Sequence, residues 1–356
     1  MDFLTDLISK KLDDKKNSSI LKEVLQVVKE AKTSNTISSS KDKLFNLTQQ
    51  EWDWMARHNS CHWVDYLIYR YKFKVYPQKQ LLEDFPQYLL IEPTSVCNLK
   101  CIMCFQSDKT FKDRGFINLD FFKNLVDQAR DAGCRAITLS SRGEPLLHKE
   151  IDKMLSYLYE SKILDVKINT NATLLSEKLS HALLSAEISE LVFSVDAITE
   201  ETYNKIRRGG KFSKVLENIK MFNKIKEKYY PKSPTITRVS SALVGGDQNE
   251  KKIANFWLNL VDEVTLKTIL PRWDAYNNSK FELKEPCVQL WRQMYVWYDG
   301  TVNPCDFDYK SYLKLGNAKE ESLKKIWKGE NFNKLRNDHL SGLRSKNNPC
   351  DRCPLV

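Results

Sequence analysis

Seven of the nine cysteines in this sequence fall into two groups with the spacing of metal ligands. The first group has the pattern C-x3-C-x2-C and consists of Cys97, Cys101 and Cys104. The second has the pattern C-x17-C-x44-C-x2-C and consists of Cys287, Cys305, Cys350 and Cys353. Clustered cysteines in a reducing compartment indicate metal binding or catalysis rather than disulfides. We therefore expect two metal centres in this chain.

The first group suits a cubane iron–sulfur cluster. Three thiolates on one short loop bind three irons of a four-iron, four-sulfur (4Fe-4S) cluster, and the fourth iron stays open for a small molecule. A structural zinc site is the alternative, but zinc normally takes four ligands. No fourth Cys or His stands at local spacing, and Cys134 opens a predicted strand. The residues favour the cluster.

The second group can close all four irons of another cubane or hold one zinc ion as an all-cysteine site. Residue types alone leave both open. Asp299-Gly300 stands between the apolar stretches 294–298 and 302–305 and is a strong hairpin-turn signal. Cys287 therefore precedes a hairpin and Cys305 lies at its exit, where the terminal pair can fold back onto both.

The elements that must position these cysteines alternate between strands and helices. Strands are predicted over 88–92, 136–140, 166–169, 190–195, 235–240 and 263–267. Helices are predicted between them over 119–132, 150–161, 177–185, 214–228 and 249–260. This alternation predicts a parallel sheet, either open or curved into a partial barrel. The loops after the carboxyl ends of the strands form its active face, and the first group lies in such a loop.

The triad after the first strand resembles the signature of the radical S-adenosylmethionine (SAM) superfamily. The segment 141–145 resembles that family's Gly-Gly-Glu motif, with Arg142 in place of the first glycine. The resemblance implies that SAM chelates the open iron and is cleaved to methionine and a 5′-deoxyadenosyl radical. It also implies a set of SAM-binding residues: Gly143, Glu144, Asn169, Asn171, Ser194, Asp196 and Arg207. Arg208 is the alternative to Arg207 in this set.

The C-terminal region resembles a SPASM module or its shortened "twitch" form. The resemblance is carried by 298–305, 315–317, 322–323, 326–327 and 349–353. Four cysteines imply the twitch form, with one fully ligated auxiliary 4Fe-4S cluster. The pattern is similar to aminocyclitol dehydrogenases of the 2-deoxy-scyllo-inosamine dehydrogenase type of butirosin biosynthesis. That similarity implies oxidation of a carbinol to a ketone, with the auxiliary cluster as electron acceptor and with Arg272 and Asp306 as catalytic residues. Asp308 is expected to be a solvated surface residue.

These observations predict an α/β fold in three parts. Residues 1–85 form a helical N-terminal extension, with apolar residues at helical spacing over 20–32 and 52–71. Residues 86–270 form a partial (β/α)6 radical SAM barrel, and 271–356 form a small α+β twitch/SPASM-like domain with a helix over 320–328.

The formal net charge of +10 is explained first by a Lys-rich composition with solvated helix faces, and attraction to acidic partners is the alternative. We expect a flavodoxin or ferredoxin-type electron donor and a small, carbohydrate-like substrate: a sugar, an aminocyclitol or a nucleotide-linked sugar. Peptide modification is an alternative enzyme function, and a zinc-binding module is the non-enzymatic one. The charges are scattered rather than blocked, so no nucleic acid is expected. No segment approaches the length of a membrane span and none reads as a signal peptide, which predicts a cytoplasmic protein without membrane contact.

Overall fold

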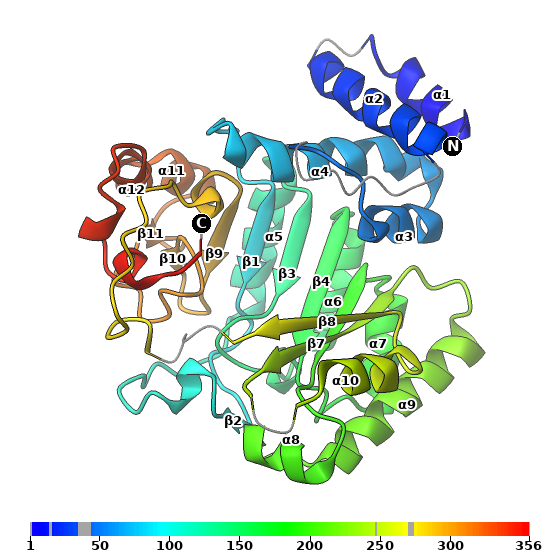
Figure 1. The fold of residues 1–356 in the computed structure, drawn as a ribbon, viewed down its shortest axis with the longest axis vertical. Helices are drawn as coiled ribbons and strands as arrows, with labels where there is room; N and C mark the ends of the chain where they lie inside the picture. Colours follow the sequence, from blue (N-terminus) through cyan, green and yellow to red (C-terminus); the bar gives the residue numbers. More distant parts are fainter. Residues whose placement is uncertain (1, 14–15, 35–43, 246–247, 270–273, 356) are drawn as a thin grey trace. The chain divides into compact units, whose positions relative to one another are not determined.

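The computed structural model describes residues 2–13, 16–34, 44–245, 248–269 and 274–355 (Figure 1). The chain divides into two compact units, Met1–Glu83 and Asp84–Val356. The three-part division at 85/86 and 270/271 stays a prediction.

The first unit is helical. Its helices are α1 (Asp2–Lys10), α2 (Ser18–Ser34), α3 (Gln49–Arg57), η1 (Ser60–His62) and α4 (Trp63–Gln78). The apolar pattern over 52–71 therefore spans three helices, because the backbone turns at His58 and the Asn59 side chain caps η1. The buried Glu51 carboxylate pairs with Arg70 and Lys74 at 2.7 and 2.8 Å and joins α3 to α4.

The second unit is built on a nine-stranded sheet of order β11-β10-β9-β1-β3-β4-β5-β7-β8. The six predicted strands are β1 (Tyr88–Ile91), β3 (Ala136–Leu139), β4 (Asp165–Thr170), β5 (Glu190–Ser194), β7 (Ile236–Leu243) and β8 (Glu263–Thr268). All neighbouring pairs among these six are parallel, so their carboxyl ends meet at one edge of the sheet. The predicted α/β class with a parallel sheet is confirmed.

The helices between these strands pack their apolar faces on the sheet. They are α5 (Leu119–Asp131), α6 (Ile151–Glu160), α7 (Glu177–Ser185), α9 (Phe212–Tyr229) and α10 (Glu250–Leu258). Three begin at side-chain caps, Asn118, Ser176 and Asn249, which accept hydrogen bonds from the first turn. A short helix that the sequence reading missed, α8 (Glu200–Ile206), leads into the two-residue strand β6 (Arg207–Arg208).

The C-terminal segment continues the same sheet. After η5 (Val288–Trp291), β9 (Gln293–Val296) pairs with β1 in parallel, so Leu89 stands opposite Met294. The predicted hairpin follows, as β10 (Thr301–Asn303) pairs antiparallel with β9 and with β11 (Gly316–Asn317). Two helices, α11 (Leu323–Lys328) and α12 (Glu330–Leu340), then cover this end (Figure 1). The predicted helix 320–328 begins later, because Ser322 is its cap.

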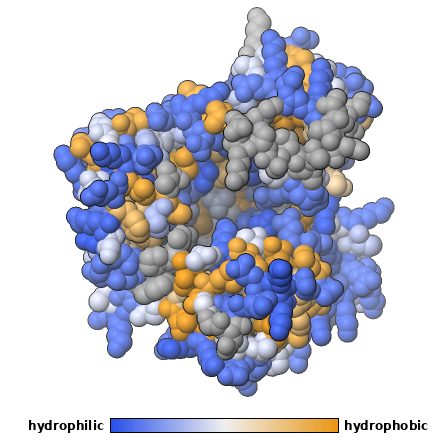
Figure 2. Space-filling view, viewed as in Figure 1, coloured by the Kyte–Doolittle hydropathy of each residue, from blue (hydrophilic) through white to orange (hydrophobic). Residues whose placement is uncertain are grey.

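The surface of the molecule is mostly hydrophilic in the view of Figure 2, with apolar atoms gathered around α10. Leu258 of that helix is 53% exposed. Among the described residues, no helix combines the length and apolar character needed to cross a bilayer.

Candidate active site

A cavity of about 500 Å³ lies at the carboxyl ends of the parallel strands. Its wall contains all three cysteines of the first group, together with residues in or directly after the carboxyl-terminal parts of β3, β4, β5 and β7. Ten of the site residues predicted from the sequence line this cavity: Cys97, Cys101, Cys104, Gly143, Glu144, Asn169, Asn171, Ser194, Arg207 and Asp306. Residues from several separate segments of the chain therefore converge on one site.

The loop with the first three cysteines is held in an extended form. Its strand β2 (Lys100–Cys101) pairs antiparallel with β6, so Cys101 stands opposite Arg207. The backbone N–H groups of Leu99 and Gln106 donate to the Sγ atoms of Cys97 and Cys104, each at 3.5 Å. Such donors are what cluster thiolates take from a protein.

The thiols need a positive partner to ionise here. Burial raises the pKa of Cys97 to about 11 and that of Cys104 to about 12, and it also raises that of Cys101. Iron would supply the missing positive charge, because a metal ion deprotonates a coordinating thiol outright. The residues present thus fit a cluster held by three thiolates. Within the described ranges, no three His, Cys, Asp or Glu side chains are placed to share one ion, whereas a cubane spreads its thiolates over separate irons.

The segment 141–145 makes a tight approach to the cysteine loop. A Cβ on Gly143 would stand 2.2 Å from the carbonyl oxygen of Thr94 and 2.4 Å from that of Val96, so only glycine fits there. Ser141 has a φ of 120°, which L-residues rarely adopt. The strain and the close contact together fix how this loop enters the cavity.

The Glu144 carboxylate is hydrogen-bonded to the end of β4 and to the loop that follows it. Its carboxylate accepts hydrogen bonds from Thr170 Oγ1 at 2.6 Å and from the backbone nitrogens of Asn171 and Leu146 at 2.7 and 3.1 Å. Burial raises the pKa of Glu144 despite these donors. The carboxylate therefore joins two of the cavity loops and presents buried negative charge to a cationic ligand.

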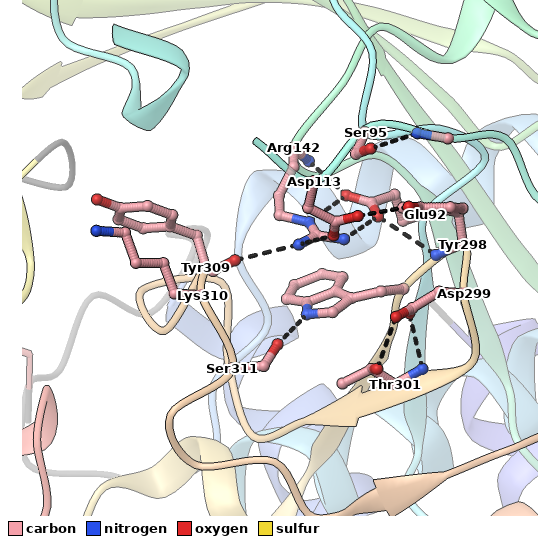
Figure 3. A network of polar contacts seen from close by, with 12 residues as sticks. Glu92, Ser95, Asp113, Arg142, Tyr298, Asp299, Thr301, Tyr309, Lys310 and Ser311 are labelled. Carbon is pink, nitrogen blue, oxygen red and sulfur yellow. Dashed lines mark hydrogen bonds and ion pairs between the residues drawn. The ribbon is translucent and has the colours of Figure 1, made fainter. Parts of the chain in front are cut away.

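Arg142, at the position of the missing glycine, is buried in a polar network (Figure 3). Its guanidinium forms a two-pronged pair with Glu92, Nε–Oε1 at 2.8 Å and Nη2–Oε2 at 2.7 Å. Nη1 also meets Asp113 Oδ2 at 2.9 Å and the backbone oxygen of Tyr309 at 3.1 Å. The Cζ atom lies 4.5 Å from the ring centroid of Trp297. Arg142 thus connects β1, the loop after the cysteines and the C-terminal hairpin.

The two asparagines after β4 differ in their surroundings. Asn169 Oδ1 is buried at the cavity without a hydrogen-bond partner among the described residues, as are the Oγ atoms of Ser141 and Ser241. A bound polar ligand would satisfy such atoms. The Asn171 side chain instead bonds Asn98 Oδ1 at 2.9 Å and Thr173, so it supports the cysteine loop.

Asp196 and Arg207 form a buried ion pair, Oδ2–Nε at 2.7 Å. Asp196 does not line the cavity, contrary to the expectation of a ligand-binding role, because its other oxygen accepts from the Ala242 backbone at 2.8 Å. Arg207 does line it, and its Nη1 lies 3.9 Å from Cys101 Sγ. The rival Arg208 is exposed and faces away from the cavity lining.

The four cysteines of the second group gather at the C-terminal hairpin. Burial raises the pKa of the Cys305 thiol, and the neighbouring Cys350 and Cys353 raise it further. Burial also raises the pKa of Cys350, and Cys287 adds to that rise. Cys305 and Cys350 thus lie close enough to the other cysteines of the group to be affected by their charge, and the donor set fits one fully thiolate-ligated centre.

Two residues that the sequence reading missed support this second group. Arg344 is buried, and its guanidinium donates to the backbone oxygens of Cys350 at 3.3 Å and Cys353 at 3.1 Å. His339 Nδ1 accepts from the backbone nitrogen of Cys287 at 3.2 Å. Neither carries a local sequence signal, because each contact depends on how the terminal segment folds back.

Of the two predicted catalytic residues, the structure describes one. Arg272 lies outside the described residues. Asp306, which directly follows Cys305, lines the cavity. Asp308 is buried rather than solvated: it accepts from Tyr276 Oη at 2.7 Å and from the Leu313 and Tyr312 backbones at 2.7 and 2.9 Å.

Several cavity residues were not predicted as site residues at all. Half of them bear a hydroxyl group, and Lys267 adds a cation: Tyr88, Ser140, Ser141, Thr170, Ser240, Ser241, Thr268 and Tyr295. Their positions at or beside the strands of the sheet were the available signal, since the carboxyl ends of parallel strands meet at one edge.

Comparison with known families identifies two domains. Residues 91–256 match the Radical SAM superfamily, and residues 287–354 match the SPASM iron–sulfur cluster-binding domain. These two domains imply SAM and two 4Fe-4S clusters as cofactors, as predicted. The domain part of the predicted resemblance is therefore confirmed.

Curated relatives carry the name GTP 3′,8-cyclase. One from Desulforamulus reducens is 34% identical over 37% of this chain and 41% of its own length. One named a probable GTP 3′,8-cyclase, from Methanococcus maripaludis, is 31% identical over 35% of this chain and 42% of its own. One from Limosilactobacillus fermentum is 26% identical over 70% of each chain. The chain thus spans about two fifths of the length of the first two relatives.

Solved structures share the fold. BtrN, in complex with AdoMet and 2-DOIA, has a TM-score of 0.53 and 20% identity, covering 76% of this chain and 94% of BtrN. SuiB of Streptococcus suis, bound to the precursor peptide SuiA, has a TM-score of 0.59 and 18% identity, covering 90% of this chain and 79% of SuiB. Identity this low shows the fold alone.

Proposed function

We propose that this protein, a radical SAM enzyme with an auxiliary iron–sulfur domain, oxidises a carbinol of a polyhydroxylated small molecule to a ketone. The proposed substrate class is a sugar, an aminocyclitol or a nucleotide-linked sugar, and the proposed electron acceptor is the auxiliary cluster held by Cys287, Cys305, Cys350 and Cys353. Arg272 remains a proposed substrate-binding residue.

The adjacency of Cys305 and Asp306 carries the proposal. SAM, when bound, supplies a radical that removes the hydrogen atom from the carbinol carbon and leaves as 5′-deoxyadenosine. The resulting carbinol radical becomes a ketone when it loses one proton and one electron. Asp306 lines the cavity and offers a carboxylate for the hydroxyl proton. Cys305, the residue before it in the chain, would ligate the auxiliary cluster, so the electron acceptor would lie next in sequence to the residue that takes the proton.

The chemistry of the cavity wall supports a hydroxylated substrate. The hydroxyls of Ser140, Ser240, Ser241, Thr268 and Tyr295 offer donors and acceptors to a polyol. The buried, unpartnered oxygen of Asn169 adds another acceptor.

The cavity favours such a substrate over a nucleoside triphosphate. Among the described residues, its cationic side chains are Arg142, Arg207 and Lys267. Arg142 is already paired with Glu92, and Arg207 with Asp196. A triphosphate requires several cations at close range, because each phosphoryl group carries charge.

Deuterium transfer tests this proposal. The anaerobically reconstituted enzyme, with SAM and dithionite, is incubated with a panel of carbinol-deuterated hexoses and aminocyclitols, with ribose-deuterated GTP and with a deuterated peptide library. We expect deuterium in 5′-deoxyadenosine, and a ketone two mass units lighter than its unlabelled substrate, from a member of the first panel. Transfer from GTP or peptide alone would refute the dehydrogenase.

Two variants test separately whether the auxiliary cluster accepts the electron and whether Asp306 accepts the proton. Cys305→Ala should still cleave SAM but should form no ketone, whereas the matched Cys61→Ala, at an exposed cysteine, should behave as the parent. Asp306→Asn should lower the rate of ketone formation and change its pH profile, whereas Asp274→Asn should do neither. Normal turnover by Cys305→Ala would eliminate the auxiliary acceptor.

A further inference from the structure

The cysteine loop has a second side. Along β2 and its flanks, Cys97, Leu99, Cys101 and Met103 face the substrate cavity. The alternate residues Asn98, Lys100 and Ile102 face outward and line a separate groove of about 940 Å³. Alternation follows from the extended backbone, in which successive side chains point to opposite faces. A single thickness of chain therefore separates the cluster ligands from this groove.

The groove is basic. Its wall includes Lys100, Lys109, Arg114 and Arg208, all of them exposed. Lys100 and Arg208 stand opposite each other in the β2–β6 pair, so two of the charges are fixed by the backbone.

These charges are not neutralised within the described part of the chain. No described carboxylate forms an ion pair with Lys100, Lys109 or Arg208. Arg114 donates to a backbone oxygen, that of Asp113, and lies over the Phe111 ring. The one acidic side chain in the wall, Asp108, is paired with Lys310 at 2.6 Å. The groove therefore keeps a net positive potential.

The cluster behind this wall must receive an electron for each SAM that it cleaves. Bound SAM and substrate would occupy the cavity side, which leaves the groove side as the free approach for the electron. The groove lies on that side, and its charge would draw a negatively charged protein to it.

Resting on the proposed radical SAM function, we infer that the groove of Lys100, Lys109, Arg114 and Arg208 is the docking surface for an acidic one-electron carrier protein. The carrier holds its flavin or iron–sulfur centre at a negatively charged rim. The basic side chains orient that rim over Asn98 and Lys100, next to Cys97 and Cys101. One electron passes from the reduced carrier to the oxidised cluster, so the carrier is oxidised by one electron.

Charge reversal with two reductants tests the inference. The probe is a recombinant acidic flavodoxin, reduced photochemically, and the reading is 5′-deoxyadenosine formed from SAM. Lys109→Glu/Arg208→Glu should raise the flavodoxin concentration for half-maximal rate about tenfold at low salt. Dithionite needs no docking, so the dithionite-driven rate should stay within about twofold of the parent. Lys220→Glu/Lys224→Glu on α9 changes the net charge equally outside the groove and should leave both rates at the parental level.

The salt dependence of the flavodoxin-driven rate is a second test. Between about 50 and 300 mM salt the parent's flavodoxin-driven rate should fall steeply, whereas that of the groove variant should be nearly flat. An unchanged flavodoxin dependence in the groove variant, or an equal loss in the α9 variant, would overturn the docking site. If the double variant lost its visible cluster absorbance, Lys109→Glu alone would decide by the same comparison. Failure of the parent with dithionite would instead refute the proposed function.

Discussion

Arg142 offers a quantitative test of how the cavity is held together. Arg142 is 3% exposed and Glu92 is 0% exposed, so Arg142→Gln leaves a carboxylate buried without its counter-charge. Breaking a buried pair from one side costs about 3–5 kcal/mol. For a unit as large as Asp84–Val356, each kcal/mol lowers the melting temperature by about 2 °C. We therefore expect a decrease of about 6–10 °C.

The assay is anaerobic calorimetry of the reconstituted full-length protein. Glu92→Gln alone should also destabilise, while the double variant Arg142→Gln/Glu92→Gln should lose less than the sum, because neither charge is then left alone. Lys220→Gln, on the exposed face of α9, is the control and should shift the melting temperature by less than about 1 °C. A decrease for Arg142→Gln no larger than this control, or strict additivity in the double variant, would refute the account of Arg142 as a buried connector.

Three other predictions address separate parts of the molecule. Gly143→Ala should abolish SAM binding in equilibrium dialysis, since its Cβ would stand 2.2 Å from a backbone oxygen; parental affinity would contradict this. Arg344→Gln should lower the iron content from about eight to about four per chain while dithionite-driven SAM cleavage persists; eight irons retained would argue against a positioning role. Glu51 has its pKa lowered to about 2 from 4.5, because the charges of Arg70 and Lys74 outweigh burial. Its stabilising effect is complete above pH 4.5 and is lost as pH falls towards 2, so hydrogen exchange in α4 should accelerate in that window, and less so in Glu51→Gln.

The sequence was enough for the elements and ligands that depend on local pattern. The six parallel strands lie close to their predicted positions, because runs of apolar residues between turn signals specify them. The cysteine triad likewise needs only its own spacing. Asp306 could be proposed because it follows Cys305 directly, although its place on the cavity wall required the structure.

Contacts between distant segments could not be predicted in this way. The pairing of Arg142 with Glu92 depends on two strands lying side by side, and its contact with Tyr309 depends on the hairpin as well. The pairing of Asp196 with Arg207, which takes Asp196 out of the cavity wall, depends on the turn of α8. Nothing in the local pattern around Asp308 shows that Tyr276 and two backbone donors would bury it.

The pairing of β9 with β1 has a consequence for how the chain is synthesised. Leu89 and Ile91 find their outer neighbours, Met294 and Val296, only after most of the remaining chain has left the ribosome. Until then β1 is an open edge with apolar side chains, the kind of edge that pairs with other chains. A chain truncated after residue 269 would keep that edge permanently, so we expect it to aggregate even though every cysteine of the first group is present.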